Sequence, residues 1–275
     1  PNPIATEEPV IIKELQKKLE SLGVKIHTSQ AVLSVENTGS GVKAITCSAD
    51  VPRDQQEDAE KFIYEADLCL VSIGRAKVSS DLGLEEMEIE TERGAIKVNP
   101  STLECSVEGV YAIGDVNGGI MLAHVASAEG DVAVANALAS MGGFPVNSTE
   151  IDYDVIPATI FTSPNIASVG LRRSQAREKG IDILMGQFPF SALGKAKCMG
   201  EEEGFIMILA DKKDYRIIGA SCIGTEAPEL ISEIALAMRH GLTVQDIGET
   251  IHSHPTISEM VLEGSEAVLG RAVHK

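Results

Sequence analysis

The sequence contains no tryptophan, and aromatic residues make up only 4% of its 275 positions. Its cores must therefore be built mainly from aliphatic side chains and methionine, which can still reach the packing density of protein interiors. Long apolar runs are also lacking, since none approaches the ~20 residues that a membrane-spanning helix requires. The composition, 44% hydrophobic and 23% charged, is ordinary for a globular protein with one large or two modest domains.

Basic residues are scarce relative to acidic ones. Lysine and arginine number 23, against 41 aspartates and glutamates, which gives a formal net charge of -18. A field of this sign repels phosphate backbones. We therefore expect neither a nucleic acid nor a membrane among the partners of this protein.

Closely spaced cysteine pairs are missing as well. The five cysteines are Cys47, Cys69, Cys105, Cys198 and Cys222. Their wide spacing argues against a disulfide framework and against a zinc site, so we expect no metal and buried thiols in a reducing compartment. That compartment would be the cytoplasm, or a mitochondrial matrix or plastid if a transit peptide directs the protein there.

The first part of the chain predicts one helix followed by strands. Apolar residues recur at helical spacing over residues 8–22, and Gly23 is a suitable stop. Strand-like runs follow at Val24–His27, Ala31–Val35 and Val42–Cys47. Residues 66–74 are mostly apolar and end in Gly74, a pattern typical of a strand buried on both faces of a parallel sheet.

A second apolar run, Val110–Asp115, predicts another strand, which ends in Gly114 and Asp115 and precedes a helix over residues 121–140. Ligands of open α/β sheets bind beyond the carboxyl ends of strands. A glycine there lets a cofactor approach, and an aspartate can accept hydrogen bonds from its hydroxyl groups. The alternative interpretation is a tight strand-to-loop turn that binds nothing.

Beyond residue 150 the pattern changes to strands gathered among helices without strict alternation. This arrangement favours an α+β domain with an antiparallel sheet. The expected strands are Val155–Phe161, Ala167–Gly170, Ile183–Phe190, Phe205–Ala210 and Arg216–Ile223. The expected helices are Ser174–Lys179, Pro228–His240 and Ser258–Leu269.

The stretch from His252 to Glu259 holds two histidines, a proline and a glutamate within eight residues. Proline suits the first position of a helix, so Pro255 predicts a helix start with His254 just outside and Glu259 about one turn in. The carboxylate would accept one ring N–H of His254 and leave the other nitrogen for proton transfer. The alternative is that His254 only caps the helix.

Five segments, in order along the whole chain, resemble motifs of the flavoprotein pyridine nucleotide-disulfide reductases. They are Val71-Ser72-Ile73-Gly74-Arg75, Val110–Asp115, Gly118–His124, Phe161–Gly170 and His254–Glu259. Within that family, the Met121-Leu122-Ala123-His124 form is most similar to the dihydrolipoamide dehydrogenases. The resemblance implies that residues 1–75 are the C-terminal part of an NAD-binding domain. Residues 76–150 would be a central FAD-binding segment and 151–275 a dimerisation domain.

The resemblance also implies which residues meet the cofactors FAD and NAD. The FAD contacts would be Gly114, Asp115, Met121, Leu122, Ala123 and His124. Gly74 would lie against NAD, and Val32 is assigned there from its strand position alone. For the side chains of Met121 and Leu122, a role in packing only remains the alternative.

Enzymes of this kind oxidise dihydrolipoamide to lipoamide and pass the electrons through a redox disulfide and FAD to NAD⁺. By resemblance, His254 is the base that deprotonates the substrate thiol, and Glu259 orients it. One subunit supplies this pair to the other, which implies a homodimer. The expected partners are the lipoyl domains of 2-oxo acid dehydrogenase or glycine cleavage complexes.

The family's first flavin glycine motif, its C-x-x-x-x-C disulfide and its nicotinamide glycine motif have no match in this sequence. We therefore interpret the chain as the C-terminal portion of such an enzyme and expect the 275 residues alone to be inactive. Two alternatives are another disulfide reductase or a transhydrogenase of the same fold, and a fragment that serves only dimerisation and flavin docking.

Overall fold

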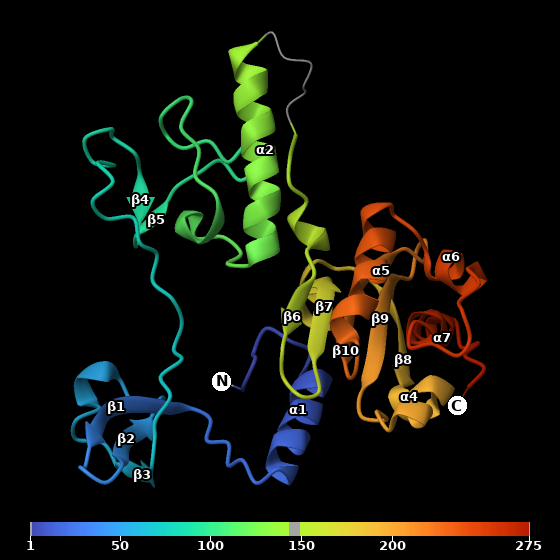
Figure 1. Cartoon of the computed structure of the whole chain (residues 1–275), viewed down its shortest axis with the longest axis horizontal. Helices are drawn as coiled ribbons and strands as arrows, with labels where there is room; N and C mark the ends of the chain where they lie inside the picture. Colours follow the sequence, from blue (N-terminus) through green and yellow to red (C-terminus); the bar gives the residue numbers. More distant parts are fainter. Residues whose placement is uncertain (1, 143–148, 275) are drawn as a thin grey trace. The chain divides into compact units, whose positions relative to one another are not determined.

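The computed structural model describes residues 2–142 and 149–274 (Figure 1). Contacts divide the chain into two compact units, residues 1–72 with 157–275 and residues 73–156. The domain limits expected from the sequence, at residues 75 and 150, stay a prediction. No helix in the described ranges is long and apolar enough to cross a membrane.

The larger unit is built on a five-stranded antiparallel sheet in the order β6-β7-β10-β9-β8 (Figure 1). The strands are β6 (Ala158–Ile160), β7 (Ile166–Gly170), β8 (Ile183–Pro189), β9 (Phe205–Asp211) and β10 (Ile217–Ile223). Each was expected from the sequence within about three residues, and the antiparallel α+β class is confirmed.

Helices cover one face of this sheet. The longest are α5 (Ala227–Arg239) and α7 (Glu259–Val268), and their buried side chains join one core with alternate residues of β9, Ile206 and Ile208. Three shorter helices complete the unit: α3 (Arg173–Glu178), α4 (Gly194–Met199) and α6 (Val244–Glu249). The sequence predicted α3, as Ser174–Lys179, but not α4 and α6.

The opposite face of the sheet is covered by helix α1 (Pro9–Ser21). Its buried Ile11 and Leu15 share a core with Met207 of β9 and Ile223 of β10. Met207 alternates with Ile206 and Ile208 along the strand, so it points to the other face. Burying an aliphatic side chain of this size contributes roughly 1.5–3 kcal/mol.

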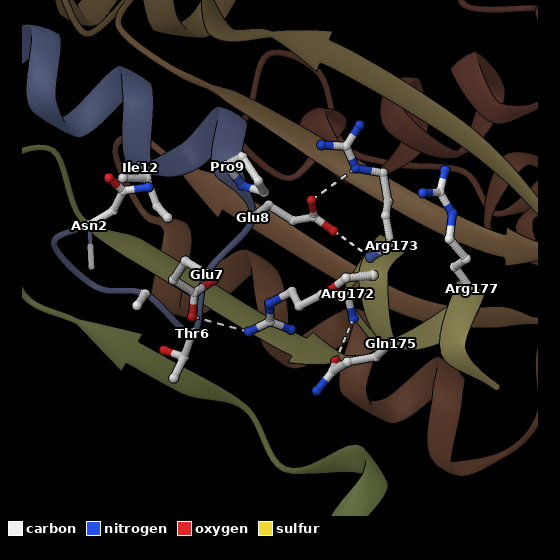
Figure 2. A pocket seen from close by; sticks show the side chains of 12 residues that line it. Asn2, Thr6, Glu7, Glu8, Pro9, Ile12, Arg172, Arg173, Gln175 and Arg177 are labelled. Atoms are coloured by element: carbon white, nitrogen blue, oxygen red, sulfur yellow. Dashed lines mark hydrogen bonds and ion pairs between the residues drawn. The ribbon is translucent and has the colours of Figure 1, made fainter. Parts of the chain in front are cut away.

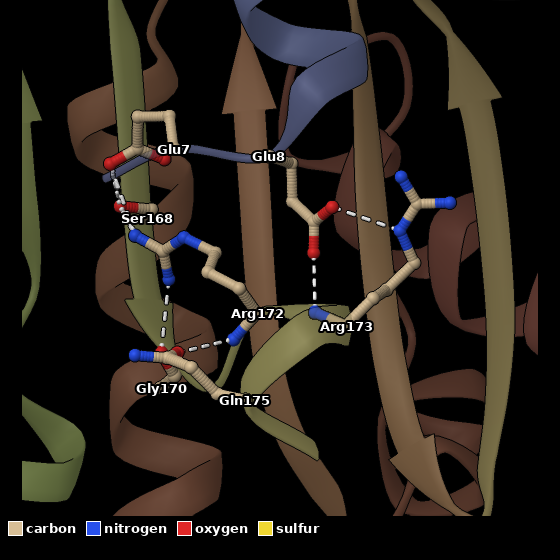
Figure 3. Close-up of polar contacts among 7 residues, drawn as sticks. All are labelled: Glu7, Glu8, Ser168, Gly170, Arg172, Arg173 and Gln175. Atoms are coloured by element: carbon tan, nitrogen blue, oxygen red, sulfur yellow. Dashed lines mark hydrogen bonds and ion pairs between the residues drawn. The ribbon is translucent and has the colours of Figure 1, made fainter. Parts of the chain in front are cut away.

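Two neighbouring glutamates fasten the start of α1 to the end of β7 and the start of α3 (Figure 3). Glu8 accepts bonds from the backbone N–H and the Nε of Arg173, at 2.6 Å and 2.8 Å. Glu7 accepts from Arg172 Nη2 and from the Ser168 hydroxyl, both at 3.0 Å. The two glutamates and two arginines border a cavity of about 620 Å³ together with Arg177 and Gln175 (Figure 2).

A three-stranded antiparallel sheet follows α1, made of β1 (Gln30–Asn37), β2 (Val42–Ser48) and β3 (Phe62–Ala66). Two predicted strands are wrong. Val24–His27 is irregular, and residues 67–74 are extended without strand pairing, with Leu68 and Leu70 86% and 90% exposed. A strand needs a neighbour for its backbone groups, and no described segment pairs with either run.

The smaller unit contains helix α2 (Ala123–Met141), the hairpin β4 (Thr91–Glu92) and β5 (Ala95–Ile96), and a 3-10 turn at Gly114–Asn117. The predicted helix is confirmed. The predicted strand Val110–Asp115 is wrong, because Tyr111 makes only an isolated bridge with Glu104 and residues 114–115 belong to the 3-10 turn. Its core side chains are Leu84, Ile89, Ile96 and Ala112.

Candidate active-site residues

The structure brings His254 and Glu259 together at the entrance to α7. His254 Nδ1 lies 2.9 Å from Glu259 Oε1, and the second carboxylate oxygen accepts the Thr256 N–H at 2.9 Å. The Thr256 hydroxyl donates to the Ser253 carbonyl at 2.6 Å, which closes the turn. Because the carboxylate is an acceptor, Nδ1 must carry the proton, and in the neutral ring Nε2 is then the basic nitrogen.

The way this pair is built differs from the prediction. Pro255 is not the first helical residue, since α7 begins at Glu259 and the His254–Pro255 peptide bond is cis. Glu259 therefore stands at the helix start itself, where a carboxylate is favoured by the helix dipole. The local spacing was sufficient to predict the contact but not the turn that makes it.

The two partners differ in exposure. The His254 side chain is 72% exposed, whereas that of Glu259 is 12% exposed. Burial raises the pKa of Glu259, but the hydrogen bonds from Thr256 and His254 and the charges of His254 and His274 outweigh it, so that this pKa lies below its ordinary value. Glu259 thus stays ionised beside a ring that is open to solvent.

His252 lies two residues away but has a different environment. Its side chain is 6% exposed, Nδ1 is 2.9 Å from the Thr250 carbonyl, and Nε2 is 3.0 Å from Glu233 Oε1 on α5. With both nitrogens engaged, His252 holds the loop that presents His254 against α5. Glu233 was not predicted as a partner of His252, because the two residues lie 19 positions apart.

A further imidazole–carboxylate pair joins Glu263 of α7 to the segment beyond that helix, with His274 Nδ1 2.6 Å from Glu263 Oε1. Glu263 follows Glu259 by four residues, which places both carboxylates on the same side of the helix. It also accepts the Val273 N–H at 2.9 Å and so fixes the end of the described chain.

In the smaller unit, the predicted flavin residues lie on the 3-10 turn, at the start of α2 and just before that helix. Asp115 is exposed, as are Met121, Ala123 and His124, whereas Leu122 is half-buried. Gly114 is buried with a φ of 72°, and an added Cβ would lie 3.1 Å from that of Ala126. Gly114 therefore allows the turn to approach the helix. No side chain caps the N-terminus of α2.

The 3-10 turn is held by Glu129 of α2, a residue that was not predicted from the sequence. Glu129 is 1% exposed and accepts the Gly114 N–H at 2.6 Å and the Asn117 amide at 3.0 Å. Its other oxygen accepts the Tyr153 hydroxyl at 2.8 Å. The burial of Glu129 is indicated by its apolar neighbours, since it shares one helical face with Val125, Val132 and Ala133.

The two residues assigned to NAD lie on exposed segments. Gly74 is exposed with a φ of 118° in the extended run, and Val32 is 63% exposed on β1. The cysteines are all free, and Cys47 and Cys222 are buried as expected. Cys69 and Cys198 are exposed, which corrects the expectation of buried thiols throughout. In the described ranges, no group of three or more His, Cys, Asp or Glu side chains is arranged to hold a metal ion.

Comparison with known proteins places these segments in one family. The family model for pyridine nucleotide-disulphide oxidoreductases matches residues 1–130, and the model for their dimerisation domain matches residues 156–264. The chain belongs to the pyridine nucleotide-disulphide oxidoreductases. This family is FAD- and NAD-dependent.

Individual relatives agree with this membership. The chain is 38% identical over 264 residues to a dihydrolipoyl dehydrogenase of Halobacterium salinarum, covering 96% of this chain and 52% of that protein. It is 39% identical over 271 residues to one from Bacillus subtilis, covering 98% and 54%. The solved structure of LpdA from Mycobacterium tuberculosis matches with a TM-score of 0.81 at 25% identity, over 94% and 53% of the two chains. The chain thus spans about half the length of the relatives that it matches.

Proposed function

We propose that this chain is the C-terminal portion of a dihydrolipoyl dehydrogenase and that it contributes the acid/base pair His254–Glu259. The observation that carries the proposal is the 2.9 Å bond between these residues, which leaves Nε2 of an exposed imidazole available. The identity of 36–39% to dihydrolipoyl dehydrogenases over nearly the whole chain supports it. Cap function alone does not require an imidazole that faces solvent.

The proposed chemistry starts with the dithiol substrate. A thiolate, not a thiol, attacks a disulfide, and a thiol of pKa ≈ 8.5 is only a few per cent ionised near pH 7. Nε2 of His254 would take the thiol proton, and the resulting imidazolium would be stabilised by the Glu259 carboxylate 2.9 Å from Nδ1. The low pKa of Glu259 suits this role, because the carboxylate keeps its charge and does not take the proton itself.

The residues of the smaller unit fit FAD. Asp115 has an exposed carboxylate that can accept bonds from hydroxyl groups. Apolar surface is offered by three residues that are each 38–44% exposed, Ile113, Ile120 and Met121. The N-terminus of α2 has no side-chain cap, and the partial positive charge of a helix N-terminus favours an anionic edge of a ligand. FAD held there would supply the electron-transfer chemistry that links the redox disulfide of the complete enzyme to NAD⁺. Gly74 and Val32 are proposed to border the NAD site.

The proposal includes a homodimer, in which the segment matched by the dimerisation-domain model forms the interface. Each subunit would then offer its His254 to a thiol held by its partner. Lipoyl domains of 2-oxo acid dehydrogenase or glycine cleavage complexes would carry the substrate. The five free cysteines agree with a reducing compartment such as the cytoplasm.

The test compares these 275 residues with the complete enzyme. We expect dihydrolipoamide-dependent reduction of NAD⁺ only from the complete FAD-containing enzyme and a dimer from both proteins in sedimentation analysis. Glutathione disulfide offered with NADPH serves as the control substrate for a different disulfide reductase. A complete enzyme that turns over the control substrate and not dihydrolipoamide would overturn the proposed function. Turnover by the 275 residues alone would overturn the assignment as a portion.

A further inference from the structure

The smaller unit contains a buried carboxylate that the proposed acid/base chemistry does not use. Glu129 is 1% exposed, although it belongs to a residue type that is rarely buried unless paired. It lies on α2 six residues beyond Ala123, on the helical face shared by Val125, Val132 and Ala133. An exposed glutamate at this position would keep its hydration, whereas a buried one loses it. The burial of Glu129 therefore calls for an explanation.

Three donors from separate parts of the chain converge on this side chain. Oε2 accepts the Gly114 N–H at 2.6 Å and the Asn117 Nδ2 at 3.0 Å, and both donors belong to the 3-10 turn. Oε1 accepts the Tyr153 hydroxyl at 2.8 Å from the short turn at residues 153–155. Burial together with the Glu129 carboxylate raises the pKa of Tyr153 to about 12, so this hydroxyl keeps its proton and remains a donor.

The turn held in this way is the one that carries Asp115. Gly114 precedes Asp115 directly and Asn117 follows it by two residues, so Glu129 fixes the backbone on both sides of Asp115. Asp115 itself is exposed and free to face a ligand. Packing closes the arrangement, because Gly114 lies against Ala126 and an added Cβ at Gly118 would lie only 2.7 Å from Ala95.

We infer that Glu129 is the positioning residue for the cofactor turn, acting through Gly114 and Asn117 to hold Asp115 in place, with Tyr153 locking the carboxylate. This inference rests on the proposed function, because it assumes that Asp115 faces FAD. Glu129 does not touch the cofactor. Its contribution is that the turn is already ordered when the cofactor binds, which reduces the entropy lost on binding.

The test uses the complete FAD-containing enzyme with four single substitutions: Glu129→Ala, Glu129→Gln, Asn117→Ala and Tyr153→Phe. Glu129→Ala removes all three bonds, and we expect FAD to dissociate at least about tenfold more readily, since the turn must then be ordered when the cofactor binds. The visible absorption band of the bound flavin should also shift. Asn117→Ala and Tyr153→Phe remove one bond each and should give smaller losses in the same direction.

Glu129→Gln provides the rescue. The amide oxygen can still accept from Gly114 and Asn117, and its NH₂ can donate to the Tyr153 oxygen. We therefore expect FAD affinity and spectrum close to those of the unsubstituted enzyme. Asp131→Asn, an exposed carboxylate on the same helix, is the matched control and should have no effect.

The outcomes separate the two proposals. An enzyme that binds no FAD at all would overturn the proposed function and this inference together. Normal FAD affinity in all four variants, with or without a lower melting temperature, would overturn the inference alone. If Glu129→Ala does not fold, Asn117→Ala and Tyr153→Phe decide the question by the same two readouts.

Discussion

Glu259, the first residue of α7, places its Oε1 2.9 Å from Nδ1 of His254. The other carboxylate oxygen is fixed by the Thr256 N–H, so the glutamate cannot turn away from the ring without breaking a second bond. The carboxylate is nearly buried and the ring is exposed. This asymmetry orients one nitrogen inward and presents the other to whatever approaches the surface.

The low pKa of Glu259 predicts a defined pH dependence of folding stability. The folded state holds this proton less tightly than the unfolded state, whose pKa is near 4.5. At pH values between the folded and the unfolded pKa, the unfolded chain binds more protons than the folded one. The free energy of unfolding therefore rises with pH, and the contribution of Glu259 to stability is lost as pH falls through the folded pKa. Denaturant unfolding from pH 6 to about 3 should show this contribution in the unsubstituted protein and not in Glu259→Gln. Glu249→Gln, an exposed carboxylate, should follow the unsubstituted curve.

The ion pair between Glu8 and Arg173 predicts a difference between two positions on α1. Glu8 is 2% exposed and makes two bonds to Arg173, whereas Glu14 pairs with Lys17 only at 3.8 Å on the surface. Glu8→Ala should lower the free energy of unfolding by about 2 kcal/mol, because buried charged hydrogen bonds are lost. Glu14→Ala should change it by less than about 0.5 kcal/mol. Equal effects in urea denaturation would show that the Glu8 contact does not hold α1.

The raised pKa of Tyr153 predicts that this side chain loses its proton only at high pH. With a pKa raised to about 12, it keeps its proton after an ordinary tyrosine with a pKa of 10 has lost it. The folded state then binds more protons, so the stabilisation is complete below pH 10 and is lost as pH rises toward 12. Ultraviolet titration of the four tyrosines should show one late phase, which Tyr153→Phe removes. Tyr215→Phe, at a position 39% exposed, should leave the late phase intact.

The bridge from His252 to Glu233 predicts an effect on turnover. His252→Ala removes the contact between the His254 loop and α5, and we expect kcat for dihydrolipoamide oxidation to fall by roughly tenfold or more through misplacement of His254. The KM should change less, since the substrate does not meet this buried ring. His240→Ala, an exposed histidine at the end of α5, is the control. A rise in KM at constant kcat would contradict the positioning role.

The sequence was informative where contacts are local. His254 and Glu259 are five positions apart, and α1, α2, α5 and the strands of the antiparallel sheet follow from hydrophobic periods within each segment. Whether an apolar run finds a pairing partner was not predictable in the same way. Residues 67–74 have the composition of a central strand, yet they lie exposed because no described segment pairs with them.

Helical glutamates with structural partners were the other source of error. Glu129 and Glu233 lie on helices where a glutamate ordinarily faces solvent, and only the folded chain shows their partners. For Glu129 the apolar neighbours at helical spacing were a usable signal. For Glu233 the partner lies on a loop 19 residues away, which no local pattern indicates.

The central claim is that His254 is the base that accepts the thiol proton of dihydrolipoamide. The most direct test is the pH profile of kcat for dihydrolipoamide oxidation by the complete enzyme and by His254→Gln. Glutamine can still bond Glu259, so the turn and the bound FAD should be unchanged. We predict that kcat falls by about 10²–10⁴-fold near neutral pH and that the acidic limb of the profile, which a general base produces, is lost. A His254→Gln enzyme with normal FAD content and an unchanged rate and pH profile would contradict the account.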